Sequence, residues 1–153
     1  MPKLVESIQT PLSPEAAFAY VSDFAQQSEW DPNTVSSRRR DEGPIGPGSR
    51  FTLEVRMGGR VTPMEYRITE YEAPRRVVLV GKGSGVWSED EINFTGDPGG
   101  TRVDHVATIR LSGLLGLVQP LLGRALRSIA RAAAEGMKRE LDRRAASVQR
   151  GAG

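Results

Sequence analysis

Short alternating segments, separated by turns rich in glycine and proline, fill the middle of this 153-residue chain from Thr34 to Leu111. Within each segment apolar and polar side chains alternate, which is typical of a strand with one buried face. The clearest turn is Gly58-Gly59, because two glycines supply the positive φ angles of a two-residue hairpin. The pattern predicts six consecutive antiparallel strands, joined by a first strand over residues 3–9 into one curved seven-stranded sheet.

Helical patterns precede and follow these strands in the chain. Ser13-Pro14-Glu15 predicts a helix start, because serine caps free amides and proline tolerates the first helical position. A second short helix is expected over residues 23–29, ending before Pro32. One long helix is predicted over residues 119–147, with a kink or a fresh start at Pro120. The apolar residues of this helix and of the segment before it recur every three or four positions: Leu114, Val118, Leu121, Leu122, Ala125, Ile129, Ala133, Met137 and Leu141.

Composition excludes several classes of site. The chain has no cysteine, which excludes disulfides, thiolate metal sites and cysteine nucleophiles. With a single histidine, and with Glu89-Asp90-Glu91 alternating between sheet faces, we expect no metal and no cofactor. No apolar run reaches the ~20 residues of a membrane helix, and no leader pattern opens the chain. We therefore expect a cytoplasmic protein with no integral membrane segment, one domain over residues 1–148, and a disordered tail over residues 149–153.

Positive charge gathers near the C-terminus. From Leu114 onward the chain has eight basic and three acidic residues, although its net charge is only +2. No nucleic-acid-binding motif accompanies this charge, so we expect no nucleic-acid partner. A solvated helix face and a surface for an acidic partner or an anionic membrane remain open alternatives. Trp87 falls on the outward parity beside Glu89 and Glu91, so a homodimer contact there also stays open.

The order of elements resembles the START-like (SRPBCC) superfamily of polyketide cyclase/dehydrase and lipid-transport proteins. Besides Ser13-Pro14-Glu15 and Trp30, the likeness is carried by three segments, Glu65–Tyr71, Pro74–Val77 and Gly99–Val103. It spans the chain from about Lys3 to Arg144, and its signatures are structural, so they specify no reaction. The resemblance implies an α+β helix-grip fold, in which the curved sheet wraps a long C-terminal helix and leaves a deep apolar cavity between them.

In such a fold, the residues of inward parity line either a ligand cavity or a filled core. A cavity of this kind suits a small hydrophobic molecule, lipid-like or polyketide-like and aromatic. Trp30 lies where the helical segment meets the second strand, as a lid or as a packing plug. The predicted wall comprises Trp30, Phe51, Leu53, Val55, Met64, Tyr66, Ser88, Asp90, Ile92, His105, Ala107, Leu122, Ala125 and Ile129.

Three polar groups of that wall are the candidates for chemistry: His105, Asp90 and Tyr66. Asp90 and His105 lie on neighbouring strands with inward parity, and an unpartnered buried carboxylate is costly, so a hydrogen bond or a shared water is expected. In one interpretation the three groups form a satisfied polar patch in a binding pocket, and the protein is a ligand carrier or sensor. In the alternative, His105 is a general acid or base oriented by Asp90, Tyr66 polarises a carbonyl, and the protein is a cyclase or dehydratase.

Overall fold

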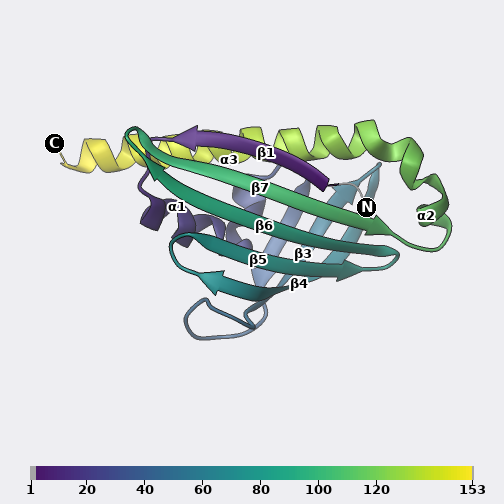
Figure 1. Cartoon of the computed structure of the whole chain (residues 1–153). Coiled ribbons are helices and arrows are strands. Elements are labelled where there is room, and N and C mark those ends of the chain that lie inside the picture. The colour runs from purple at the N-terminus through teal and green to yellow at the C-terminus, as the bar shows by residue number, and fades with distance from the viewer. Residues whose placement is uncertain (1–2, 153) are drawn as a thin grey trace.

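Seven antiparallel strands form one curved sheet in the computed structural model, which describes residues 3–152 (Figure 1). The spatial order of the strands is β1-β7-β6-β5-β4-β3-β2, so β1 alone leaves the hairpin sequence and closes the sheet against β7. This arrangement confirms the predicted seven-stranded sheet. The strands are β1 (Lys3–Thr10), β2 (Thr34–Arg39), β3 (Arg50–Met57), β4 (Arg60–Glu72), β5 (Arg76–Gly83), β6 (Val86–Asp97) and β7 (Gly100–Leu111).

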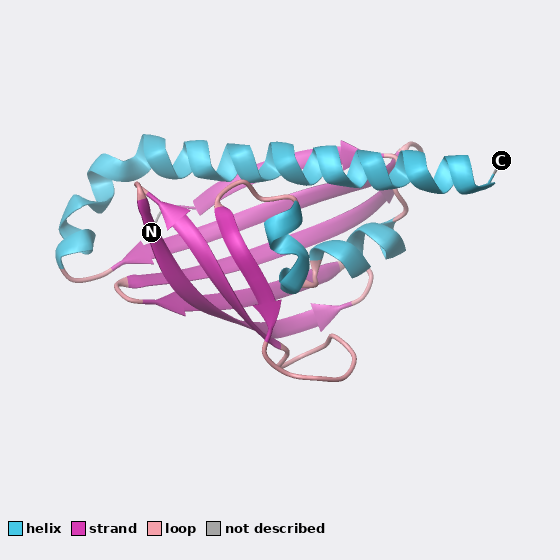
Figure 2. Cartoon of the chain, turned by 180° about the vertical axis from the view of Figure 1, so that it is seen from behind, coloured by secondary structure: helices cyan, strands magenta, loops and turns pink. Residues whose placement is uncertain are grey.

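Two short helices follow β1 and pack on the concave side of the sheet (Figure 2). They are α1 (Pro14–Val21) and the 3-10 helix η1 (Phe24–Glu29). The start of α1 is the predicted one, because the Ser13 side chain accepts a hydrogen bond from the Ala16 amide at 3.2 Å. The β3–β4 hairpin turns at Gly58 and Gly59, whose φ angles are +57° and +83°.

The C-terminal region consists of three helical pieces instead of one helix over residues 119–147. They are α2 (Leu114–Val118), the 3-10 helix η2 (Gln119–Leu122) and α3 (Gly123–Ala152). Pro120 has no amide hydrogen to donate, so the helix breaks there and starts afresh at Gly123, as one of the two expected outcomes. In the structure α3 continues through Ala152, and Gly153 lies outside the described residues. A disordered tail over residues 149–153 and a single domain over residues 1–148 stay predictions.

The core lies between α1, η1, α3 and the concave face of the sheet. Phe18 of α1 meets Tyr71 and Phe94 edge-on, with ring centroids 5.1 and 5.2 Å apart. Met137 and Leu141 of α3 are fully buried, and α3 runs the length of the molecule beside β1 (Figure 1). Within residues 3–152 no helix combines the length and the apolar character that crossing a bilayer requires. The fold is the expected α+β helix-grip arrangement.

Candidate functional site

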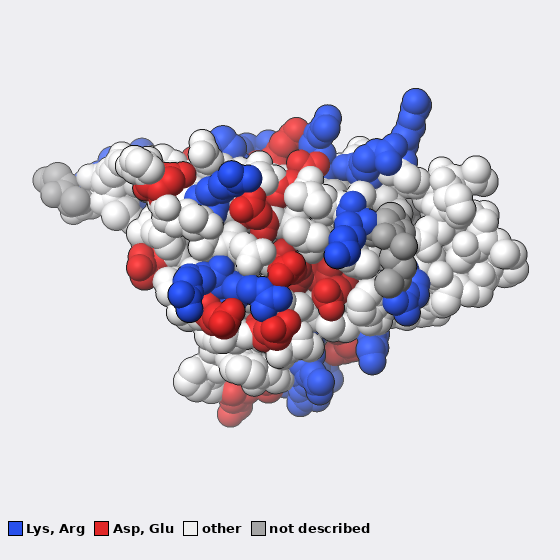
Figure 3. Space-filling view, viewed as in Figure 1, with Lys and Arg blue, Asp and Glu red and all other residues white. Residues whose placement is uncertain are grey.

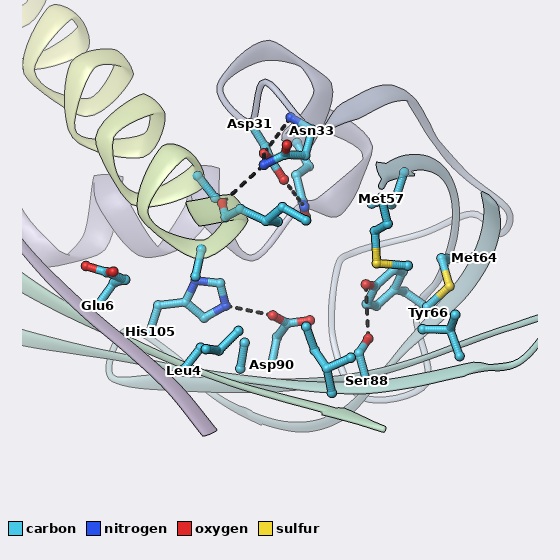
Figure 4. A pocket seen from close by; sticks show the side chains of 18 of the residues that line it. Leu4, Glu6, Asp31, Asn33, Met57, Met64, Tyr66, Ser88, Asp90 and His105 are labelled. Atoms are coloured by element: carbon cyan, nitrogen blue, oxygen red, sulfur yellow. Dashed lines mark hydrogen bonds and ion pairs between the residues drawn. The ribbon is translucent and has the colours of Figure 1, made fainter. Parts of the chain in front are cut away.

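A pocket of about 90 Å³ opens between the concave face of the sheet, α3 and the loop that follows η1 (Figure 4). Each contributing strand supplies residues from the half of its length that lies nearer to α2: the starts of β1, β4 and β6 and the ends of β3 and β7. The pocket is therefore confined to one half of the sheet. It is lined by Leu4, Glu6, Gln27, Trp30, Asp31, Asn33, Val55, Met57, Met64, Tyr66, Val86, Ser88, Asp90, His105, Ala107, Ile109, Ile129, Ala130 and Ala133.

Most of the predicted wall lies at this pocket. Asp90 and Ser88 are buried on the inward face of β6, as the alternation predicts, while Glu89 and Glu91 are more exposed. Whether these residues contact a ligand stays a prediction. The predicted residues that line the pocket are Trp30, Val55, Met64, Tyr66, Ser88, Asp90, His105, Ala107 and Ile129.

Three predicted wall residues, Phe51, Leu53 and Ile92, lie in the packed core instead of the pocket. Their inward orientation is as expected, since all three are fully buried. In front of β3 the space is filled by η1, whose Phe24 ring centroid lies 6.2 Å from that of Phe51. Alternation along a strand gives the face of a residue but not what packs against that face.

Two further corrections concern the C-terminal helices. Leu122 lies in η2 and Ala125 in the first turn of α3, and neither lines the pocket. Ala125 is exposed, while its neighbour Leu126 is buried. Leu122 precedes the start of α3 at Gly123, so the apolar period of α3 does not extend to it. Within α3 the first buried residue is Leu126, one position beyond Ala125. Ile129, Ala130 and Ala133 are the residues of α3 that line the pocket.

Asp90 and His105 meet at the floor of the pocket (Figure 4). Asp90 is paired with Ala107 and His105 with Ile92, so the two side chains are diagonal neighbours on adjacent strands. His105 Nε2 lies 2.7 Å from Asp90 Oδ1, and both side chains are largely buried, with 17% and 13% of their surface exposed. Because an ionised carboxylate can only accept, this contact assigns the Nε2–H tautomer to a neutral His105 and leaves the Nδ1 lone pair as an acceptor.

Tyr66 and Ser88 form a second polar pair on the same wall. Their hydroxyl oxygens lie 3.1 Å apart, and both residues are buried. Burial raises the pKa of the Tyr66 phenol well above its ordinary value, and the negative charge of Asp90 adds to the rise. Tyr66 is therefore a neutral hydroxyl, able to donate or accept a hydrogen bond within an apolar surrounding.

The Asp31 cluster is a part of the site that sequence reasoning missed. Buried Asp31 accepts hydrogen bonds from the Asn33 amide at 2.9 Å, from Thr34 Oγ1 at 3.0 Å and from Gln27 Nε2 at 3.1 Å. The Asn33 side chain in turn donates to the Ile129 carbonyl at 3.1 Å, which ties this loop to α3. The sequence feature that indicates this cluster is the Asp31-Pro32-Asn33 segment, because an aspartate side chain often accepts a hydrogen bond from the backbone amide two residues further on.

Glu6 is the other polar residue that the predicted wall omitted. It is paired with His105 across β1 and β7, it lines the pocket, and it is partly exposed. With Asp31 and Asp90, it makes the lining rich in carboxylates, while no lysine or arginine among residues 3–152 lines the pocket. Glu6 shares the parity of Leu4 in the first strand, which places both side chains on one face of the sheet. Its position beside His105 depends on the pairing of β1 with β7, which lie far apart in the sequence.

Comparison with known proteins supplies the family. The family described as "Polyketide cyclase / dehydrase and lipid transport" matches residues 1–142. The chain belongs to this family. Its resemblance to the START-like superfamily is thereby confirmed.

The relatives of this family member include an uncharacterized protein of Mycobacterium tuberculosis, 27% identical over 125 residues, which cover 78% of this chain and 76% of the relative. Among the solved structures that share the fold are an aromatase/cyclase and a START superfamily protein. An aromatase/cyclase from Streptomyces sp. R1128 superposes with a TM-score of 0.74 at 13% identity, covering 94% of each chain. A START superfamily protein from Mycobacterium smegmatis gives 0.70 at 16% identity, covering 90% of this chain and 97% of that one.

Proposed function

We propose that this family member binds one small hydrophobic molecule in the pocket between the sheet and α3, as a carrier or sensor. The observation that carries the proposal is the composition of the pocket wall. Apolar side chains of Val55, Met64, Ile109 and Ile129 line the cavity. The Asp90–His105 and Tyr66–Ser88 pairs lie on its sheet side, and Asp31 lies on the opposite side, in the loop next to α3 (Figure 4). A wall of this kind gains affinity from apolar burial, at about 25 cal/mol per Å², and orients the ligand by its few polar contacts.

The volume and charge of the pocket narrow the ligand class. At about 90 Å³ the cavity is small beside the roughly 300–1,000 Å³ of sites for drug-sized molecules, which favours a ligand of one or two rings or a short acyl chain. Carboxylates at Glu6, Asp31 and Asp90, with no cationic side chain in the lining, disfavour ligands that bury a carboxylate or a phosphate. A neutral molecule with one carbonyl or hydroxyl group fits Tyr66 and His105 best.

The test uses the two tryptophans as reporters. Trp30 is buried at the pocket and its indole N–H has no hydrogen-bond partner among the described residues, whereas Trp87 lies beneath the Arg110 guanidinium on the outward face. Titration with acetophenone, followed in ¹H–¹⁵N spectra, is expected to shift the Trp30 indole signal and leave that of Trp87 in place. Single Trp→Phe variants assign the two signals.

A pocket-filling variant tests the location of binding. Ala107→Phe places a ring in the cavity and is expected to abolish the Trp30 shift. The matched control, Ala146→Phe, adds the same ring at an exposed position of α3 and is expected to leave the shift unchanged. A wild-type titration with no shift of Trp30, or a shift that survives in Ala107→Phe, would contradict the proposal.

A second candidate function is a cyclase or dehydratase that acts on polyketide-like substrates. The observation that favours it is the 2.7 Å contact between Asp90 and His105, because an imidazole held in one tautomer by a carboxylate is a suitable general base. In this reaction the free Nδ1 of His105 would take a proton from a carbon next to a carbonyl. Tyr66, kept neutral by burial, would donate to the carbonyl oxygen.

Two variants separate catalysis from binding. If the protein is an enzyme, His105→Ala abolishes the cyclisation of a linear poly-β-ketone thioester, while the acetophenone-induced shift of Trp30 persists. Asp90→Asn lowers turnover by about 10²–10⁴-fold, because the orientation of the imidazole is lost. Wild-type protein that binds acetophenone and returns the thioester unchanged would support the carrier alone.

A further inference from the structure

The segment between the sheet and α3 exposes an unusual amount of apolar surface. We call Leu114–Leu122, which comprises α2 and η2, the α2 tip. No residue of either helix is buried, and Leu114, Leu117 and Leu121 expose 83%, 77% and 83% of their surface. Leu115 and Val118 are exposed as well. Contiguous apolar surface of this kind marks an interaction site in a folded protein.

The α2 tip is fixed to the sheet by its polar groups. The Gln119 side chain donates to the Ile109 carbonyl at 2.9 Å and accepts from the Leu111 amide at 3.0 Å. The Ser112 amide donates to the Gly85 carbonyl, and the Gly116 amide bonds back to Ser112 and Gly113. These contacts use the backbone and one glutamine, and the Leu115 side chain lies against Gly85. The side chains of Leu114, Leu117 and Leu121 remain exposed.

Positive charge adjoins this apolar surface. From His105 to Ala134 the sequence contains no aspartate or glutamate. Arg124, Arg127 and Arg131 are all exposed on the first turns of α3, at a spacing that places them along one side of the helix. In Figure 3 the end of the molecule that carries α2 is uncharged surface, with basic side chains beside it. Leucines flanked by arginines are the pattern of a segment that lies in the interface of an anionic bilayer.

We propose that the α2 tip docks on an anionic lipid surface. Leu114, Leu117 and Leu121 enter the interface, and the arginines of α3 contact the lipid headgroups. A second copy of this chain fits less well. A twofold contact between two tips would bring Arg124 and Arg127 close to their own copies, and nine residues are few beside the roughly 20–30 per side of a stable interface.

Docking at this end would also place the pocket near the lipid. The pocket is built from the strand halves that lie nearer to α2, and Ile109 belongs to its wall while its carbonyl anchors Gln119. A hydrophobic molecule that leaves the bilayer beside the tip would therefore have a short path to the pocket. The docking itself does not depend on the proposed ligand, since it uses residues outside the pocket wall.

Flotation with lipid vesicles tests the proposal on the full chain without added ligand. Wild-type protein is expected to float with vesicles of phosphatidylcholine and phosphatidylglycerol at about 0.05 M salt, and to be released at about 0.5 M salt. It should not float with phosphatidylcholine alone. The variant Leu114→Ser/Leu117→Ser/Leu121→Ser is expected to bind about a hundredfold more weakly, because the inserted apolar area is lost.

Two further variants keep the result interpretable. Arg124→Gln/Arg127→Gln is expected to weaken binding about tenfold or more while leaving the leucines intact. Val148→Ser removes an exposed apolar residue near the far end of α3 and should bind as wild type does. Absence of wild-type binding at low salt would overturn the proposal. So would equal binding by the leucine variant at an unchanged melting temperature, or a dimer in solution that this variant dissociates.

Discussion

Tyr66 is the residue whose protonation depends most on the pocket. Burial and the charge of Asp90 raise its pKa above the ordinary value of 10.0, so the folded state binds the phenolic proton more tightly than the unfolded state does. The resulting stability is fully present below pH 10, where both states are protonated. It is lost as the pH rises above 10 toward the folded-state pKa.

The first prediction concerns the loss of stability that Tyr66 causes above pH 10. Between pH 10 and 11, ionisation of Tyr66 in the unfolded state should lower the free energy of unfolding by up to about 1.4 kcal/mol per pH unit. Tyr66→Phe removes this contribution, so its urea-unfolding free energy should fall less steeply with pH than that of the wild type. At pH 8 the variant should be less stable by about 1 kcal/mol, because Ser88 loses its hydroxyl partner. Equal slopes above pH 10 would contradict the raised pKa.

The second prediction concerns Asp31. Its carboxylate oxygens face donors from Gln27, Asn33 and Thr34, so the amide of Asp31→Asn would set one NH₂ group against them. We expect a loss of about 1–3 kcal/mol in chemical denaturation. Asp41→Asn is the matched control, since Asp41 belongs to a more exposed ion pair with Arg39 and its substitution should cost less stability than Asp31→Asn does. If Asp31→Asn lowers the free energy of unfolding by less than Asp41→Asn does, the proposed structural role of the Asp31 cluster is contradicted.

At the scale of single residues, the sequence predicted the Asp90–His105 contact but not the Asp31 cluster. The first depends on strand alternation and on one hairpin turn, and both are local patterns. The second needs the exact path of the loop after η1 and the position of Ile129 on α3, whose carbonyl is 96 positions away from Asn33 in the sequence. Sequence patterns that extend over a few residues cannot predict a contact between positions so far apart in the chain.

At the scale of elements, the contact between α3 and the Trp30 loop depends on a glycine. A Cβ atom at Gly136 would overlap the carbonyl oxygen of Trp30 and lie 3.3 Å from Cδ of Pro32. Only a residue without a side chain allows α3 to approach the loop this closely. This approach places Ala130 and Ala133 against the pocket.

The third prediction is that Gly136→Ala destabilises the protein by about 1–3 kcal/mol, since the loop or the helix must shift to admit the methyl group. Alanine is a better helix former than glycine, so without the close contact the substitution would stabilise the protein. A loss of stability therefore reports the contact with the loop. Gly123→Ala is the control: its nearest neighbour is the flexible Arg127 guanidinium at 3.4 Å, and the substitution should be neutral or stabilising by up to about 1 kcal/mol. Thermal unfolding of both variants measures the two changes in stability. An equal increase in stability for Gly136→Ala and Gly123→Ala would contradict the close contact at Gly136.

The strands and the first helix could be predicted because alternation, caps and glycine turns are short-range signals. The C-terminal helices were predicted less well. One apolar period was drawn through Pro120, which assigned Leu121 and Ala125 to the interior, although both are exposed. Leu121 lies in η2, before α3 begins at Gly123, and within α3 the first buried residue is Leu126 and not Ala125. The apolar period alone does not show where along the helix the contact with the sheet begins.

At the scale of the whole molecule, α1 and η1 divide the concave face of the sheet into a filled half and an open half. Phe18 and Phe24 fill the half that contains Phe51 and Phe94. The other half, toward α2, keeps the pocket. The family resemblance implied a deep cavity, whereas the cavity observed is small because these two helices occupy the rest of the space.

The central claim is that this remaining space holds a small hydrophobic molecule. Native mass spectrometry of the wild type and of Ala107→Phe, purified in parallel from the protein's own host, tests it most directly. We expect a small-molecule mass excess on the wild type that is lost on collisional activation and is missing from Ala107→Phe. A mass excess of equal occupancy on both proteins, or none on either, would contradict it.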